Sequence, residues 1–391
     1  MKIILTLFEN VQCRLEKLKL NCISITDEGC AALASAFNSN LRELDLSRNQ
    51  IGDSGVTEIS SLLRNSQTLQ ILSLKNNCIT EGGCHVLAAA LNSNPSNLTE
   101  LDLSENKLGN PGMKIILTLF ENVQCRLEKL KLNCISITDQ GCGALASAFN
   151  SNLRELDLSR NQIGDSGVTE ISSLLRNSQT LQILRLSDCS ITEEGYKALS
   201  SALRSNPSHL IELDLTGNDP GPSGVKQLSD LLQDPNCQLK TLRFLGPAAD
   251  EGCQYVTGIV GKNLLLLREL NLSEHKLGDT GVNQISALLQ DKHCTLNTLI
   301  LSDCSITEEG YKALSSALRS NPSHLIELDL TGNDPGPSGV KQLSDLLQDP
   351  NCQLKTLRFL GPAADEGCQY VTGIVGKNPL LLRELDLSKR G

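Results

Sequence analysis

One frame repeats along almost the whole chain and constrains its fold more than any other feature. Residues 41–56, LRELDLSRNQIGDSGV, show it: leucines at the first, fourth and sixth positions, asparagine at the ninth and glycine at the fifteenth. A repeat of this length predicts one supersecondary unit that must stack on its neighbours to bury its leucines. The units begin at Leu15, Leu41, Leu69, Leu98, Leu127, Leu153, Leu181, Leu210, Leu239, Leu267, Leu296, Leu325, Leu354 and Leu382.

The opening segment MKIILTLFENVQC belongs to this frame. The same thirteen residues return at positions 113–125, inside the chain, whereas a signal peptide would have a longer apolar core and a small-residue cleavage site. We therefore interpret residues 1–14 as a truncated first repeat and residues 1–391 as a single leucine-rich-repeat domain.

Each part of a unit has its own periodicity. Residues 41–46 alternate leucine with charged side chains, which predicts a strand with one face in the core. Residues 56–63 place apolar side chains at helical spacing, and Asn49 lies between, where an amide can bond the backbone of the turn. Parallel strands lie about 4.8 Å apart and packed helices about 8–10 Å, so the stack must curve. The sequence predicts an α/β solenoid, a horseshoe with a parallel β-sheet on its concave face and α-helices on its convex face.

Composition and charge exclude several function classes. A net charge of −10 argues against nucleic-acid binding, and no apolar run approaches the ~18 residues of a membrane span. The 15 cysteines recur at fixed repeat positions without a CxxC pair, which is typical of reduced, structural thiols in the cytoplasm and predicts no metal site. Serines, carboxylates and histidines follow the frame without forming a catalytic constellation, so we expect neither an enzyme nor a cofactor.

Two blocks of four repeats are copied almost verbatim. Residues 1–72 match residues 113–184 except at Glu28 against Gln140 and at Ala31 against Gly143. Residues 186–263 match residues 301–378 throughout. Two explanations stand for these copies, a recent duplication of blocks and an artefact of assembling a repetitive gene.

The frame LxxLxLxx(N/C)xLxxxGxxxL resembles the ribonuclease-inhibitor-like class of leucine-rich repeats. Asparagine or cysteine occupies most ninth positions, whereas Pro247 and Pro362 take that place in two copies of FLGPAADEG, where the turn backbone must be satisfied in another way. Residues 41–56 and 98–113 are most similar to the C-terminal repeats of NOD-like, or NACHT–LRR, receptors, in particular of a fish-type expanded family. That resemblance implies a sensing and autoregulatory region in innate immune signal transduction, next to a NACHT domain. The alternative is a freestanding, ribonuclease-inhibitor-like inhibitor of a basic protein or enzyme.

The third, fifth and seventh positions of each unit are expected on the concave face. Glutamate occupies the third position in alternate units, and the third and fifth positions together carry 13 acids against 7 bases. One interpretation is a ladder in which neighbouring strands neutralise each other, with each exposed pair stabilising by about 0–1 kcal/mol. The other is that the excess acid attracts a basic protein partner and that apolar interruptions of the ladder form a contact core. The candidate partner-binding residues are Ile183, Arg185, Glu212, Asp214, Arg243, Leu245, Ile300, Glu327, Asp329, Arg358 and Leu360.

Overall fold

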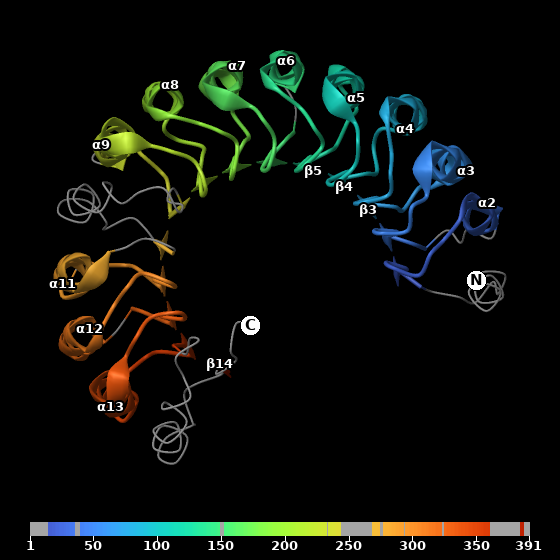
Figure 1. Ribbon diagram of the computed structural model, residues 1–391. Coiled ribbons are helices and arrows are strands. Elements are labelled where there is room, and N and C mark those ends of the chain that lie inside the picture. Colours follow the sequence, from blue (N-terminus) through green and yellow to red (C-terminus); the bar gives the residue numbers. More distant parts are fainter. Residues whose placement is uncertain are drawn as a thin grey trace. The chain divides into compact units, whose positions relative to one another are not determined.

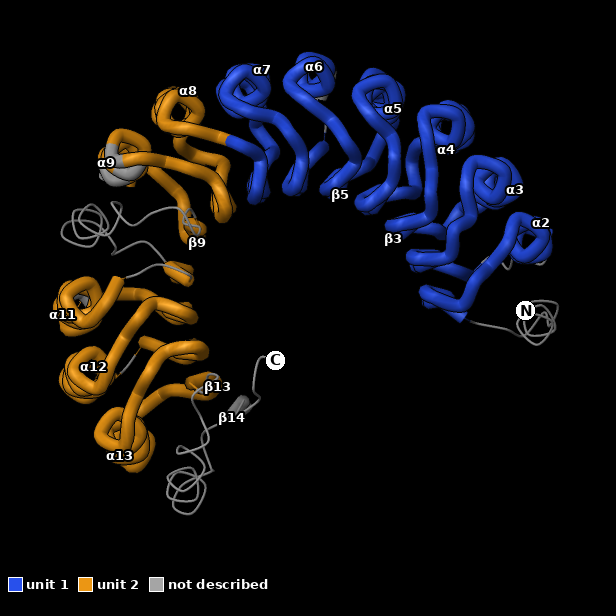
Figure 2. The backbone as a smooth tube through the Cα atoms, viewed as in Figure 1, with its two compact units in different colours: residues 1–190 blue, residues 191–391 orange. Residues whose placement is uncertain are grey.

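The computed structural model describes most of the chain and divides it into two compact units, Met1–Ser190 and Ile191–Gly391 (Figure 2). The described residues are 15–35, 40–148, 152–232, 234–243, 268–273, 277–292, 294–322, 324–359 and 384–386. Residues 1–14, Leu245 and Leu360 lie outside them, so the expectations for these positions stay predictions.

Unit 1 contains one short strand in every repeat, at the third to fifth residues of the predicted frame. The strands pair in parallel with the next strand in sequence order, and equivalent residues stand side by side, for example Leu44 against Leu72. Its strands are β1 (Lys17–Lys19), β2 (Glu43–Asp45), β3 (Ile71–Ser73), β4 (Glu100–Asp102), β5 (Lys129–Lys131), β6 (Glu155–Asp157) and β7 (Ile183–Arg185).

Helices cover the outer side of the curve that these strands form in unit 1 (Figure 1). The apolar face predicted from residues 56–63 is confirmed, because Val56 and Ile59 are fully buried on the inner face of their helix. The helices are α2 (Asp27–Ser35), α3 (Gly52–Asn65), α4 (Glu81–Ser93), α5 (Gly109–Leu117), the 3-10 helix η1 (Thr118–Glu121), α6 (Asp139–Cys142), the 3-10 helix η2 (Gly143–Ala148) and α7 (Gly164–Asn177).

Unit 2 repeats the same plan. Its strands are β8 (Glu212–Asp214), β9 (Thr241–Arg243), β10 (Glu269–Asn271), β11 (Thr298–Ile300), β12 (Glu327–Asp329), β13 (Thr356–Arg358) and β14 (Glu384–Asp386), paired in parallel wherever two are adjacent. Its helices are α8 (Glu193–Ser205), α9 (Gly221–Leu232), α11 (Gly278–Leu289), α12 (Glu308–Ser320) and α13 (Gly336–Leu347). The predicted solenoid, with a parallel sheet inside and helices outside, is confirmed in each unit.

The ninth-position asparagine holds the turn that follows each strand, as expected. The amide oxygen of Asn49 accepts from the backbone N–H groups of Ile23 (3.0 Å) and Ile25 (3.1 Å) of the preceding repeat. Its amide nitrogen donates to the carbonyl oxygens of Leu20 (2.8 Å) and Leu46 (2.7 Å). One buried side chain thus satisfies backbone groups of two repeats, which would otherwise be costly to bury.

Tyrosine replaces part of this bonding before the proline-containing repeats of unit 2. The carbonyl of Leu215 lies where an asparagine of the following repeat would donate, but that repeat has Pro247, which lies outside the described residues. The hydroxyl of Tyr196 on α8 donates to the Leu215 oxygen instead (3.4 Å). Its copy Tyr311 donates to Leu330 in the same way (3.3 Å).

Candidate functional site

The first and last residues of strands β1–β13 point to the inner side of their unit, and we call these side chains the concave strip. The middle residue of every strand from β2 to β13 is a buried leucine, as in Leu44, Leu156 and Leu299. Because side chains alternate along a strand, the flanking residues face away from the core. Parallel, in-register pairing brings each of them beside its equivalents in the neighbouring repeats.

Lysines on β1 hold the first glutamate of the strip in unit 1. The Glu43 carboxylate lies 3.1 Å from the Nζ of Lys19 and 3.2 Å from the Nζ of Lys17. Hydrogen bonds from Lys19 and then Lys17 lower the pKa of Glu43. The Glu43 carboxylate is therefore charged in the folded unit at neutral pH.

The same alternation continues over β4 to β7. Lys131 lies 2.8 Å from Glu100, and Lys129 stands between Glu100 (3.7 Å) and Glu155 (3.8 Å). Arg185, a predicted site residue, forms an ion pair with Glu155 on the preceding strand. Neighbouring strands of unit 1 thus neutralise one another, which agrees with the first interpretation of the ladder.

Arginine takes the role of lysine in unit 2. Arg243 on β9 donates from Nε to Glu269 on β10 (2.9 Å) and from a terminal nitrogen to Glu212 on β8 (3.1 Å), and it lies 3.9 Å from Asp214. Five predicted site residues therefore meet in two clusters, with Arg243, Glu212 and Asp214 in the first. Arg358 and Glu327 (2.7 Å) form the second. A guanidinium on one strand can bind the carboxylates of both flanking strands.

The aspartates of the strip also have a structural role that sequence reasoning missed. Asp214 accepts from the backbone N–H of Thr216 (3.0 Å), and Asp329 accepts from that of Thr331 (2.9 Å). An aspartate bonded to the N–H two residues on stabilises a turn. The signal was present as Asp-Leu-Ser or Asp-Leu-Thr at the end of most glutamate-bearing strands.

The acid excess is unevenly distributed between the units. The strip of β1–β7 carries six acids and five bases, whereas the strip of β8–β13 carries five acids and two bases. Lysines are replaced in unit 2 by threonine and isoleucine at most of the alternate positions. The concave strip of unit 2 is therefore the more negative of the two.

Two of the four apolar residues predicted to form a contact core lie within the described residues. Ile183 and Arg185 lie on β7 of unit 1, and the Ile183 side chain is half-buried. Ile300 lies half-buried on β11 of unit 2, between Asn271 of β10 and Asp329 of β12. Leu245 and Leu360 are outside the described residues.

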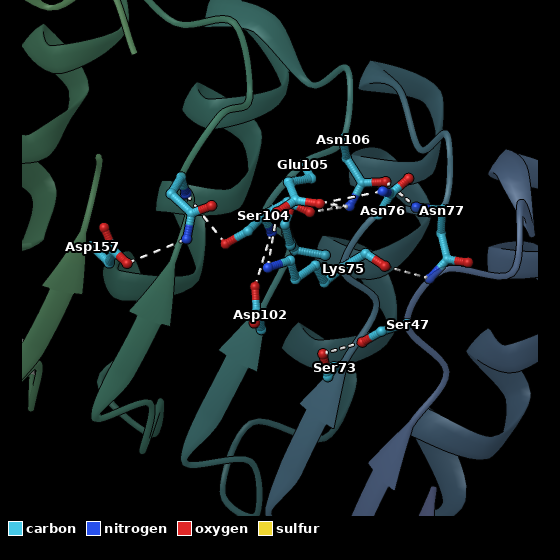
Figure 3. A network of polar contacts seen from close by, with 12 residues as sticks. Ser47, Ser73, Lys75, Asn76, Asn77, Asp102, Ser104, Glu105, Asn106 and Asp157 are labelled. Carbon is cyan, nitrogen blue, oxygen red and sulfur yellow. Dashed lines mark hydrogen bonds and ion pairs between the residues drawn. The ribbon is translucent and has the colours of Figure 1, made fainter. Parts of the chain in front are cut away.

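A polar network in unit 1 follows the strands and was not anticipated (Figure 3). Lys75 lies 2.9 Å from Glu105, and Asn76 donates to the same carboxylate (3.2 Å). The hydrogen bond from Lys75 lowers the pKa of Glu105. The hydroxyl groups of Ser47 and Ser73 lie 2.7 Å apart on adjacent repeats. The charge ladder of unit 1 therefore extends into its strand-to-helix turns.

Among the described residues, no group of three or more histidine, cysteine, aspartate or glutamate side chains is arranged to hold a metal ion. Within the same ranges, every helix is too short or too polar to cross a membrane.

Comparison with known proteins identifies the same repeat that the structure shows. A family model described as leucine rich repeat matches residues 37–60, 65–88, 94–116, 149–172, 177–200, 206–229, 264–286, 292–315 and 321–344. Ribonuclease inhibitor of Sus scrofa is 37% identical over 352 residues, which cover 88% of this chain and 76% of that protein.

A protein with NACHT and LRR domains is similar over an even larger part of the chain. NACHT, LRR and PYD domains-containing protein 14 of Homo sapiens is 35% identical over 381 residues, 96% of this chain. The chain spans only 34% of that protein. The solved structure of the Rad7 and Elc1 complex in yeast aligns with a TM-score of 0.53 at 17% identity, covering 92% of this chain and 78% of that one, and shows the shared fold alone.

Proposed function

This chain belongs to the leucine-rich-repeat family, in its ribonuclease-inhibitor-like class, and we propose that it binds a basic protein through the concave strip of unit 2. The observation that carries the proposal is the excess of acid over base on β8–β13. A surface of one charge sign attracts a partner of the opposite sign and raises its association rate. Binding, rather than catalysis, is the activity that such a strip supports.

A pair of matched variants tests this proposal with ribonuclease A as the basic probe protein. Glu269→Gln with Glu327→Gln removes two strip carboxylates from unit 2, and Glu43→Gln with Glu100→Gln removes two equivalent ones from unit 1. We expect surface plasmon resonance at low salt to show a loss of about tenfold in affinity for the first pair and little change for the second. Equal losses, or wild-type binding that does not weaken with salt, would contradict the proposal.

We infer further that the module is the sensing and autoregulatory region of an intracellular NOD-like receptor in innate immune signal transduction, adjacent to a NACHT domain in the cytoplasm. The support is the similarity to such a receptor over 96% of the chain. Long-read sequencing of full-length transcripts tests this directly. A NACHT-encoding frame that continues into Met1 is expected, and transcripts whose coding frame starts at Met1 would reject the receptor proposal.

A ribonuclease-inhibitor-like function is the second candidate. Its specific support is coverage, because the chain spans 76% of the pig inhibitor but 34% of the human receptor. The test is cleavage of a fluorogenic RNA by ribonuclease A with an equimolar amount of the chain under reducing conditions. Undiminished cleavage at micromolar concentrations would exclude this candidate and leave the receptor proposal standing.

A further inference from the structure

The charge ladder of unit 2 is interrupted at one strand. Arg243 on β9 and Arg358 on β13 are the last residues of their strands and bind glutamates of neighbouring strands. On β11 the equivalent residue is Ile300, and the first residue is Thr298. An acidic strand therefore stands on each side of β11 with no base between them.

Arg243 shows how a guanidinium fits such a place. It reaches Glu212 on one flanking strand (3.1 Å) and Glu269 on the other (2.9 Å). β11 has flanking strands of the same kind, with Glu269 on β10 and Glu327 on β12. The two strands are two spacings apart, about 10 Å, which leaves room for one side chain between the carboxylates.

The glutamates on the two strands beside β11 are more exposed than a glutamate that has a base on each side. Glu155, which has a base on each flanking strand, is 9% exposed, whereas Glu269 is 23% and Glu327 is 32% exposed. Within the described residues, each of the last two contacts an arginine on the side away from β11. Both glutamates therefore keep exposed surface in addition to their contact with arginine.

We propose that an arginine side chain of the protein partner fills this interruption, with its guanidinium between Glu269 and Glu327 and its aliphatic stem on Ile300. Arginine binds carboxylates through several N–H groups at once, and its methylene stem covers apolar surface. The proposal rests on the proposed function, since it names the side chain through which the strip recognises a basic partner. Arg243 and Arg358 then act by holding the two glutamates in position.

Unit 1 contains a comparable interruption that is already neutralised. β3 presents Ile71 and Ser73 between Glu43 on β2 and Glu100 on β4. Each of these glutamates is bound by two lysines, and they are only 15% and 19% exposed. β3 therefore serves as the internal control for β11.

Two variants of equal net charge distinguish binding at β11 from binding at β3. Ile300→Arg puts an intramolecular guanidinium where we expect the partner's, in the position that Arg243 occupies on β9. Ser73→Arg does the same on β3, and it reproduces a natural difference, because the copied position carries Arg185. The probe is a fluorescein-labelled nonapeptide of alternating glycine and arginine, measured by fluorescence anisotropy on the full chain.

We expect Ile300→Arg to weaken peptide binding at least about tenfold and Ser73→Arg to change it by less than about twofold. Equal weakening would mean that net charge alone attracts the peptide, which overturns the β11 subsite and leaves the proposed function intact. No weakening by either variant also overturns the subsite.

A second measurement avoids any effect of the substitutions on folding. The same peptide with citrulline, which is uncharged, in place of arginine should lose its binding to the wild-type chain. Binding of the citrulline peptide as tight as that of the arginine peptide would reject guanidinium recognition. Failure of ribonuclease A to bind would instead reject the proposed function.

Discussion

At the scale of single residues, a tyrosine hydroxyl takes over a bond that asparagine makes elsewhere. Asn77 donates to the Leu46 carbonyl of the preceding repeat (3.0 Å), and Tyr196 reaches the equivalent carbonyl of Leu215 from its own helix. Burial raises the pKa of Tyr196, so its hydroxyl stays protonated and remains a donor. A departure from the frame in one repeat is thus compensated by a residue of an earlier repeat.

Tyr196→Phe tests this compensation. Loss of one buried hydrogen bond should lower the free energy of unfolding by about 0.5–1.5 kcal/mol, measured by urea denaturation. Tyr311→Phe makes the same change in the copied block and should cost the same. The two effects should add, because the sites do not share a partner. A wild-type stability for either variant would show that the hydroxyl contributes nothing.

Buried and exposed cysteines should also differ in their reactivity. Burial raises the pKa of Cys30, Cys84 and Cys142 to about 12, so these thiols stay protonated at pH 8. Cys22, Cys78 and Cys134 are exposed. Because the thiolate is the nucleophile, iodoacetamide at pH 8 should modify these three exposed thiols first. Peptide mapping by mass spectrometry would refute this if the buried three reacted at comparable rates.

At the scale of elements, two nearly identical segments form different helices. Residues 27–35 form one α-helix, whereas the copy breaks after Cys142 into the 3-10 helix that begins at Gly143. The first copy has Ala31 at that place. Glycine disfavours a helix interior relative to alanine, which accounts for the break at this residue.

Gly143→Ala should restore the α-helix. The backbone there is right-handed helical, and a Cβ would meet no atom within 4 Å, so the substitution introduces neither strain nor a clash. We expect the free energy of unfolding to rise by about 0.4–1 kcal/mol. Ala31→Gly in α2 is the reverse control and should lower it. A destabilising Gly143→Ala would point to a cause of the break other than propensity.

At the scale of the whole molecule, the ladder couples folding to pH. The pKa of Glu43 is lowered by Lys19 and Lys17, and that of Glu105 by Lys75. A lowered pKa in the folded state means that these carboxylates stabilise the fold fully above the ordinary value of 4.5. This contribution is lost as the pH falls through the lowered pKa.

We therefore expect the free energy of unfolding to fall as the pH drops from about 5 to 3. Glu43→Gln should flatten this dependence, as followed by urea denaturation at a series of pH values. Glu28→Gln is the control, since Glu28 is exposed, forms no ion pair with described residues and is already glutamine at the copied position Gln140. An unchanged slope in Glu43→Gln would contradict the assignment.

The sequence by itself determined the repeat, the strand and helix in each unit, and the direction of each side chain. Leu44 and Val56 had to be buried and Glu43 had to face outward, because the periods of two and 3.6 are local properties. The turn-bonding role of the ninth-position amide was predictable for the same reason, since Asn49 follows its own strand and donates to Leu46 there.

Only the tertiary structure decided which partner each outward side chain takes. Arg243 lies 26 residues from Glu269 and 31 from Glu212, and the frame places both equally near. The bond of Tyr196 to Leu215 depends likewise on side-chain length and direction. A periodic sequence specifies the face on which a residue lies, whereas the contacts across repeats depend on geometry that arises when the repeats stack.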